Sequence, residues 1–295
     1  MSTNPALDEL SDLTESIRAE FVSPIELPEP ATRLGLQERA GQPERQFKHL
    51  HQMCLGHVEH LALSGRIKLL ALLDGYLSVV RTGSVIGHYL FARMVLEQCA
   101  FTSEVQRRLA EVSRKPEANW LPKGEEFFSL VIRFRFATGD KVLQRHLESE
   151  GIPQKLLKPI SIMNCIAALA ATPDLVHLAS LYEKFSDYVH HNGLSHYTTS
   201  SGFFVGKAAS HHASRGVMLT KKAGPISRYE YPTPAKARKA LDDTVDAVVL
   251  ATRTCNRTLA GLHRSPYTMQ QIKRMTGSEL GMMYLGKASP QSRPN

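Results

Sequence analysis

Apolar side chains between residues 43 and 80 follow a helical period, and this long stripe restricts the chain to folds in which helices pack on one another. The stripe recurs every three or four positions and comprises Phe47, Leu50, Met53, Cys54, Val58, Leu61, Ile67, Leu70, Leu73 and Leu77. Residues with that spacing lie on one face of an α-helix, which other elements must cover. We therefore expect one long helix over 43–80 with a single buried face.

Further helices are indicated along most of the chain. Apolar spacing and turn residues predict helices over 84–113, 124–150, 160–171, 173–191, 233–262 and 265–285, and a short one around 7–21. Ser84 is a suitable N-cap for the helix over 84–113, and Thr172-Pro173 and Thr233-Pro234 are typical helix starts. Residues 116–122 are expected to form a loop. The predicted fold class is mainly all-α.

Outside these helices, the sequence predicts an arm, a small β-insertion and a tail. Residues 1–44 hold several prolines and are expected to form a partly flexible arm, and residues 287–295 a disordered tail. The segments GVMLT and ISRYEYP flank KKAGP, so we expect one small β-hairpin near 216–231. One helical domain is thus predicted over 45–286.

Composition and motifs exclude several classes of protein. Apolar runs fall far short of the roughly 20 residues that a membrane-spanning helix needs, and the first 21 residues lack the apolar segment of a secretory signal. The motifs of P-loop, Rossmann, α/β-hydrolase and zinc-protease sites are absent. The four cysteines stand far apart, as is typical of reduced, buried thiols. We expect a cytoplasmic protein without membrane contact, cofactor or metal.

Positive charge is concentrated in the C-terminal third. Residues 207–295 carry 15 Lys and Arg against five Asp and Glu, whereas the net charge of the whole chain is +8. A basic segment of this kind is typical either of a solvated surface or of one that binds nucleic acid or another acidic partner. For a nucleic-acid interface, the candidate contacts are Lys221, Lys222, Lys236 and Lys239.

Histidines are clustered in one part of the sequence. Of the 13 in the chain, five lie within 23 positions, namely His190, His191, His196, His211 and His212. Imidazole is both the commonest metal ligand and the natural acid or base near neutral pH. A metal-dependent hydrolase built on His190, His196, His211 or His212 is therefore one alternative, although their spacing is not that of ligands on one helix.

Polar residues are also aligned on two otherwise apolar helices. Tyr182, Ser186 and His190 follow one another at four-residue intervals and so share a face. Arg93 and Glu97 are likewise four apart on an earlier helix. A histidine held in such a row is a candidate for acid–base catalysis. The alternative is structural, with Tyr182 and Ser186 bonded to backbone and Arg93 and Glu97 forming an ordinary ion pair.

Together, these two segments resemble a family of bacterial HEPN-like proteins. Its members carry an early helix with an R-x-x-x-E pattern and a later helix that reads L-Y-x-x-L-S-x-x-V-H-x-N/S. The first pattern matches Arg93 to Glu97 here. The residues at the positions of the second pattern are Leu181, Tyr182, Phe185, Ser186, Val189, His190 and Asn192. The resemblance covers residues 45–262.

This resemblance implies an up-and-down helical bundle, often dimeric, and relates the chain to metal-independent ribonucleases of toxin–antitoxin and phage-defence systems. Catalytic members carry an Arg that precedes a His, with four to six residues between them. His190 matches this histidine, and Lys184 stands at a position where the arginine is expected. Lysine can neutralise a phosphate but lacks the bidentate fork of arginine.

Two functions from different classes follow. The first is RNA cleavage, with His190 as the acid or base. Its candidate site comprises His190, Lys184, Ser186, Tyr182, Arg93, Glu97 and Asn192. The second is a non-catalytic HEPN-like module that binds a protein partner or nucleic acid through the basic C-terminal third. The expected partners are RNA, an antitoxin or another defence-system protein, and a second copy of the chain.

Overall fold

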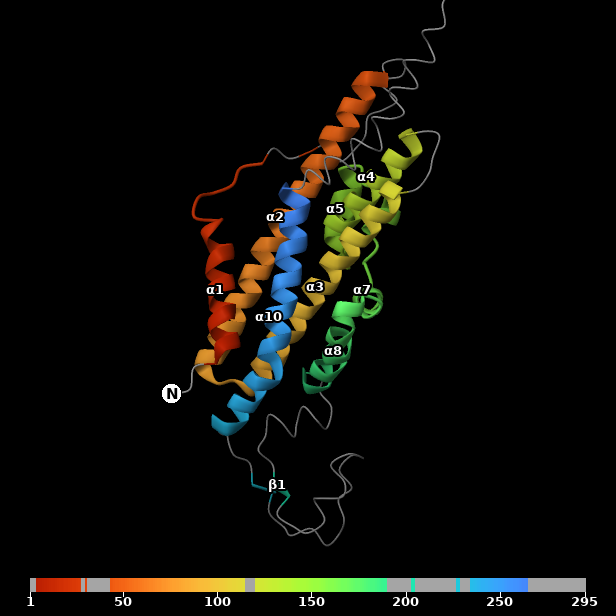
Figure 1. The fold of residues 1–295 in the computed structure, drawn as a ribbon. Helices are drawn as coiled ribbons and strands as arrows, with labels where there is room; N and C mark the ends of the chain where they lie inside the picture. The colour runs from red at the N-terminus through yellow and green to blue at the C-terminus, as the bar shows by residue number, and fades with distance from the viewer. Residues whose placement is uncertain are drawn as a thin grey trace, which may run out of the picture. The chain divides into compact units, whose positions relative to one another are not determined.

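The computed structural model describes residues 4–27, 30, 43–114, 120–189, 203–204, 227–228 and 234–264 (Figure 1). These residues are mostly helical, which confirms the all-α prediction. The helices are α1 (Pro5–Ala19), α2 (Pro43–Thr82), α3 (Val85–Arg114), α4 (Trp120–Phe136), α5 (Lys141–Ser149), α6 (Gln154–Leu157), α7 (Ile162–Ala170), the 3-10 turn η2 (Pro173–Leu175), α8 (Val176–Val189) and α10 (Pro234–Arg264). The strands β1 (Phe203–Phe204) and β2 (Ser227–Arg228) pair antiparallel.

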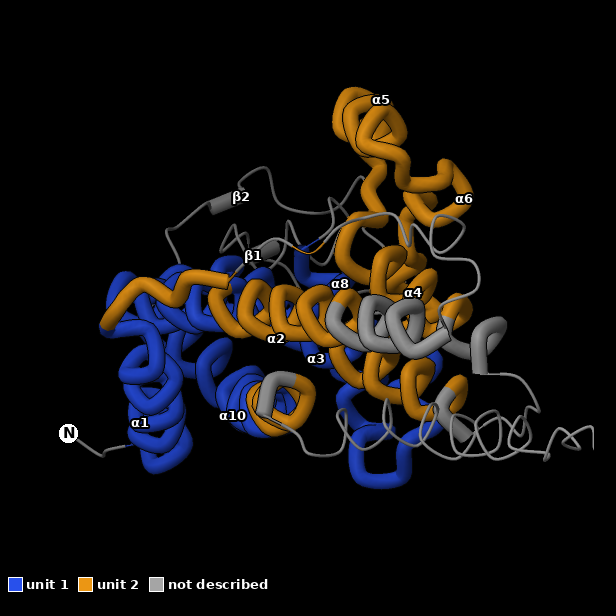
Figure 2. Tube along the Cα trace, turned by 90° about the horizontal axis from the view of Figure 1, so that it is seen from above, with its two compact units in different colours: residues 1–22, 68–100, 166–255 blue, residues 23–67, 101–165, 256–295 orange. Residues whose placement is uncertain are grey.

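The chain forms two compact units (Figure 2). Unit 1 comprises residues 1–22, 68–100 and 166–255, and unit 2 comprises residues 23–67, 101–165 and 256–295. The helices α2, α3 and α10 each contribute to both units, because each crosses a boundary between these ranges. The single domain expected over 45–286, with its arm and tail, stays a prediction.

Within unit 1, the N-terminal helix α1 packs through one apolar face and two ion pairs. Ile17 on this face is fully buried. Arg18 pairs with Asp74 of α2, and Glu9 pairs with Arg253 of α10. The short helix expected around 7–21 is therefore present, and burial of its apolar side fixes which face it turns inward.

The core of unit 2 is built from the first part of α2, the last part of α3, α4, the segment through α6 that follows it, and the end of α10. Its larger buried members are Met53, Val58, Leu61, Val105, Leu109, Phe127, Phe128, Val131, Ile132, Ile152, Leu157 and Leu262. The aromatic residues Phe127 and Phe128 of α4 therefore serve as helical core residues.

The four cysteines are all described and buried, and none of them forms a disulfide, as their spacing predicted. Cys54 and Cys165 belong to unit 2, and Cys99 and Cys255 belong to unit 1. Burial raises the pKa of the Cys165 thiol to about 11, so this thiol stays protonated at neutral pH.

The buried stripe of α2 departs from the predicted one most clearly at Ile67. Ile67 was expected in the core, but it is 54% exposed. The neighbouring Arg66 takes the inward position instead and is 1% exposed, and its Nε donates to Asn256 Oδ1 at 3.3 Å. An arginine can occupy such a position because its long apolar stem packs like a hydrophobic side chain while the guanidinium finds polar partners.

One helix was expected over 124–150, but the structure contains two. The chain breaks between α4 and α5, where Asp140 acts as the N-cap of α5 and accepts hydrogen bonds from the backbone N–H groups of Val142 and Leu143 at 2.8 and 3.2 Å. Of the loop expected over 116–122, residues 120–122 belong to α4 instead, and residues 116–119 lie outside the described ranges. The apolar spacing therefore identified helical residues here but missed the break.

The capping predictions have mixed outcomes. Ser84 caps α3 as expected, because its Oγ accepts from the Gly87 N–H at 3.3 Å. Thr172 precedes a 3-10 turn rather than an α-helical turn, and its side chain makes no capping hydrogen bond. The helix expected over 233–262 is confirmed as α10, which begins at Pro234.

Some predictions fall on residues outside the described ranges. They include the helix over 265–285, the tail over 287–295 and most of the hairpin near 216–231. Of that hairpin, only Ser227–Arg228 is described, and it pairs with Phe203–Phe204. The hairpin is therefore not confirmed.

Candidate functional site

The described part of the candidate site lies in unit 1. Arg93 and Glu97 are on α3, and Tyr182, Lys184 and Ser186 are on α8. His190 and Asn192 lie outside the described residues, as do the other four histidines of the cluster. The geometry below therefore concerns the helix that leads to His190.

Tyr182 joins the two sequence motifs through its hydroxyl group. Arg93 Nη2 donates to the Tyr182 oxygen at 3.3 Å, and the Tyr182 hydroxyl donates to Glu97 Oε1 at 3.2 Å. Arg93 Nε donates to the same Glu97 oxygen at 3.0 Å, and the guanidinium carbon lies 5.3 Å from the centre of the Tyr182 ring. We call these three residues the Tyr182 cluster.

The Tyr182 cluster is largely shielded from solvent. Tyr182 is 3% exposed, and the side chains of Arg93 and Glu97 are 19% and 30% exposed. Partly buried charges are costly unless paired, so the four-residue spacing of Arg93 and Glu97 on α3 supplies the required partner within one helix. The tyrosine then ties α8 to this pair. This arrangement is typical of a structural contact between α3 and α8 rather than of side chains exposed to a substrate.

Ser186 is engaged within its own helix. Its Oγ donates to the carbonyl oxygen of Tyr182, one turn earlier, at 2.8 Å. Serines inside helices commonly bond back in this way. Ser186 is thus bonded to backbone, as the structural alternative describes, whereas the Tyr182 hydroxyl bonds to side chains instead. Neither contact bears on the role of His190.

A second polar cluster in unit 1 includes Lys184 and was not foreseen from the sequence. The Asp243 carboxylate of α10 accepts a hydrogen bond from the Tyr89 hydroxyl of α3 at 3.0 Å. Lys239 Nζ lies 3.2 Å from one carboxylate oxygen and 3.3 Å from the other, and Lys184 Nζ of α8 lies 3.9 Å from Oδ1. We call these residues the Asp243 cluster.

Aromatic packing connects the Asp243 cluster with the end of α8. The Tyr89 ring stacks on Tyr188 with 4.0 Å between centroids and 9° between planes, and it lies 5.8 Å from the Phe185 ring. Burial, followed by the Asp243 carboxylate and Tyr188, raises the pKa of Tyr89 above its usual range. The hydroxyl of Tyr89 therefore stays protonated and acts as a donor to Asp243.

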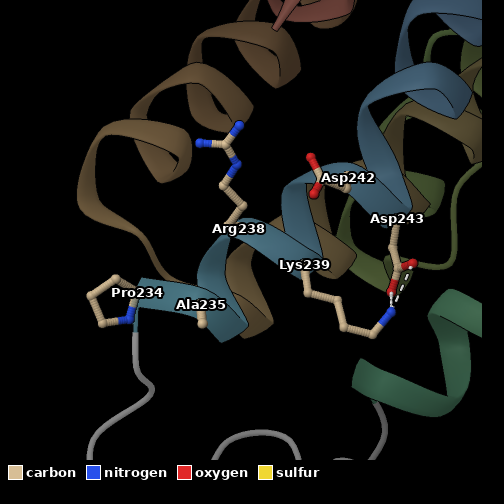
Figure 3. Close-up of a pocket in the computed structure, with 6 residues that line it drawn as sticks. All are labelled: Pro234, Ala235, Arg238, Lys239, Asp242 and Asp243. Atoms are coloured by element: carbon tan, nitrogen blue, oxygen red, sulfur yellow. Dashed lines mark hydrogen bonds and ion pairs between the residues drawn. The ribbon is translucent and has the colours of Figure 1, made fainter. Parts of the chain in front are cut away.

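Beside this cluster, the start of α10 lines an open hollow of about 570 Å³ (Figure 3). Its described lining consists of Pro234, Ala235, Arg238, Lys239, Asp242 and Asp243. Figure 3 shows the Lys239 side chain reaching the Asp243 carboxylate, whereas Arg238 points away from this pair. The hollow carries two positive and two negative side chains, so the described lining has no strong net charge.

Among the described residues, no three His, Cys, Asp or Glu side chains are grouped as metal ligands would be. The histidines of the metal-dependent alternative lie outside these ranges, so that alternative stays a prediction. In the same described part of the chain, no single helix is long and apolar enough to cross a membrane. Only α7 together with η2 and α8 meets the length and composition of a span, and that pair is bent by 112°.

Helical spacing identified Arg93, Glu97, Tyr182 and Ser186. The resemblance to HEPN-like proteins added Lys184, and neither indicated Asp243 or Tyr89. The only available signal for Asp243 was the lysine four residues before it on the same helix, which is a common surface pattern. Comparison of the chain with known protein families, with curated proteins and with solved structures gives no match.

Proposed function

We propose that this chain is a HEPN-like helical protein that cleaves RNA without a metal, with His190 as the acid or base. The observation that carries the proposal is the contact between its two motifs. Tyr182 and Glu97 are 85 residues apart, yet the tyrosine bonds directly to the Arg93–Glu97 pair. A pair of motifs that belongs to one functional unit should meet in the fold in this way.

The residues of the two motifs then take different roles. The Tyr182 cluster fixes α8, the helix whose sequence continues directly into His190. Lys184 supplies positive charge, because its side chain is 45% exposed and its ammonium group keeps a looser contact with Asp243 than Lys239 does. Ser186 is bonded to the Tyr182 carbonyl oxygen of its own helix. Asn192 is retained in the site because the resemblance assigns it.

The chemistry expected is attack by the ribose 2′-oxygen on the adjacent phosphorus. The O2′–P bond forms while the P–O5′ bond breaks, which gives a 2′,3′-cyclic phosphate and a 5′-hydroxyl group. As a base, His190 takes the 2′-hydroxyl proton and water protonates the leaving oxygen; as an acid, His190 protonates the leaving oxygen and water takes the 2′-hydroxyl proton. Lys184 stabilises the negative charge that develops on the phosphate.

The test is cleavage of total RNA and defined tRNAs in the presence of EDTA. We expect the wild-type protein to cleave and His190→Ala to lose at least about a hundredfold in rate, the lower end of what acid–base groups contribute. His177→Ala is the matched control, because His177 is exposed on the same helix and outside the site. Circular dichroism must show all three proteins folded. Equal cleavage by wild type and His190→Ala would contradict the proposal.

The binding module is the second candidate, and the contacts of Tyr182 and Ser186 favour it. Both side chains are occupied by partners within the protein, as a structural role requires. The module predicts RNA affinity that falls with salt and is weakened by charge reversal at Lys221, Lys222, Lys236 and Lys239. Binding without cleavage would support this function over catalysis.

A further inference from the structure

The Asp243 carboxylate collects donors from three helices of unit 1. Tyr89 comes from α3, Lys184 from α8, and Lys239 from α10 itself. The Asp243 side chain is only 18% exposed. A carboxylate in such a place needs charged or hydrogen-bonding partners, and here it has both kinds.

The two oxygens of this carboxylate both contact Lys239 and differ in their second partner. Oδ2 accepts from the Tyr89 hydroxyl at 3.0 Å, and Tyr89 is 3% exposed and stacked on Tyr188. This buried contact fixes the orientation of the carboxylate. Lys239 Nζ lies 3.2 Å from Oδ2 and 3.3 Å from Oδ1, and Oδ1 also faces Lys184 Nζ at 3.9 Å.

The Asp243 carboxylate does not fully neutralise Lys184, so the ammonium group of Lys184 can still bind an anionic ligand. Two ammonium groups share one carboxylate, so the three groups together carry one net positive charge. Lys239 makes the closer contact with Asp243 and neutralises most of its charge. Lys184 is held at a longer distance, where it is attracted without giving up its hydrogen-bond donors.

We propose that Asp243 is the positioning residue of Lys184, and that Tyr89 orients Asp243 for this role. The position of Lys184 is inferred from the contacts above. The consequence, that Lys184 contacts the RNA phosphate from a fixed place, rests on the proposed function. A lysine stem has four rotatable carbons, so an exposed Lys184 without this carboxylate would sample many positions.

The position is tested first without activity, by NMR of protein labelled at lysine Cε and Nζ. Lys184→Met identifies the Lys184 signal by its disappearance. We expect Asp243→Asn to shift that signal and Asp242→Asn to leave it unchanged. The two variants are matched, because both remove one carboxylate from adjacent positions of α10, and no ion pair of Asp242 is present among the described residues. If the chemical shift of the Lys184 signal is the same in Asp243→Asn as in wild type, the inference is overturned, whether or not the protein cleaves RNA.

Cleavage tests the consequence. We expect Asp243→Asn to lower kcat about tenfold with little change in KM, and Asp242→Asn to stay within about twofold of wild type. In a Lys184→Met background, Asp243→Asn should cause no further loss, because Asp243 acts through that lysine. Equal additional loss in both backgrounds would show a general structural effect and overturn the inference.

The two proposals fail in distinguishable ways. Absence of wild-type cleavage with a Lys184 signal that responds only to Asp243→Asn contradicts the proposed function and supports the assigned position. Asn can still accept the Tyr89 hydrogen bond through its amide oxygen, so Asp243→Asn should fold. Tyr89→Phe is the second variant, since it keeps the stacked ring and removes only the orienting hydroxyl. It should shift the Lys184 signal in the same direction by a smaller amount, and an unmoved signal would refute the role of Tyr89.

Discussion

His88 on α3 is a buried histidine whose titration should weaken the fold in mild acid. It is 1% exposed, and its Nδ1 has no hydrogen-bond partner among the described residues. Its ring meets the edge of Tyr76, with 5.5 Å between centroids and 78° between planes. Burial lowers the pKa of His88 from 6.5 to about 4, because the charged imidazolium would lose its hydration there.

The size of the effect follows from the two protonation equilibria. Between pH 6.5 and 4, the unfolded chain binds a proton at His88 that the folded chain does not bind, so the free energy of unfolding falls as the pH falls. One pKa unit corresponds to about 1.4 kcal/mol. Lowering the pH from 7.0 to 4.5 should therefore remove about 2 kcal/mol of stability through this residue alone.

Urea unfolding of wild type and His88→Phe at both pH values measures this contribution. Phe keeps a flat ring against Tyr76 and cannot titrate, so the variant should lose about 2 kcal/mol less than wild type on acidification. His177→Gln serves as the control, because His177 is exposed on α8 and its replacement should leave the wild-type difference intact. The same loss in wild type and His88→Phe would refute the reasoning.

Four further predictions concern packing and charge. Tyr182→Phe removes the hydroxyl that bridges an ion pair and should lower the free energy of unfolding by about 1–3 kcal/mol in urea titrations. Gly87→Ala should destabilise by about 1–3 kcal/mol in thermal unfolding, since its Cβ would lie 2.8 Å from the stiff Val79 side chain. Gly261→Ala, whose Cβ would meet nothing within 4 Å, should instead stabilise by up to about 1 kcal/mol. Burial acts to raise the pKa of Glu104, but hydrogen bonds from two arginines outweigh it and leave the pKa below 4.5. Glu104→Gln should therefore lose about 2 kcal/mol at pH 7 relative to wild type, with the difference shrinking as the pH falls below 4.5 in urea titrations.

Much of the helical architecture was predictable because apolar spacing is a local property. The helices now described as α2, α3 and α10 were expected with nearly their observed bounds. The burial of Arg66 in place of Ile67 was not expected, because a search for apolar residues overlooks an arginine whose apolar stem packs in the core. The missed break before α5 had a readable signal in Gly139 and Asp140, which the apolar residues on both sides outweighed.

In the candidate site, too, contacts within one helix were predictable and contacts between helices were not. The Arg93–Glu97 pair follows from helical geometry, so its spacing alone predicted it. Its bond to Tyr182 depends on how α3 and α8 pack, which spacing within one helix does not determine. Asp243 meets Tyr89 across 154 residues of chain, and carboxylates beside a lysine are common on surface helices. Only the tertiary structure could single this one out.

The reactivity of the four buried cysteines can be used to measure local opening of the structure. A thiol reagent in solution reacts only when the structure around a sulfur opens, and Cys99 and Cys255 lie in one unit while Cys54 and Cys165 lie in the other. If the units open independently, the two pairs of thiols should be labelled at different rates and respond separately to urea. If α2, α3 and α10 transmit unfolding along their length, all four should be labelled together. The native sequence thus carries two internal probes per unit, and no engineered label is needed to follow cooperativity.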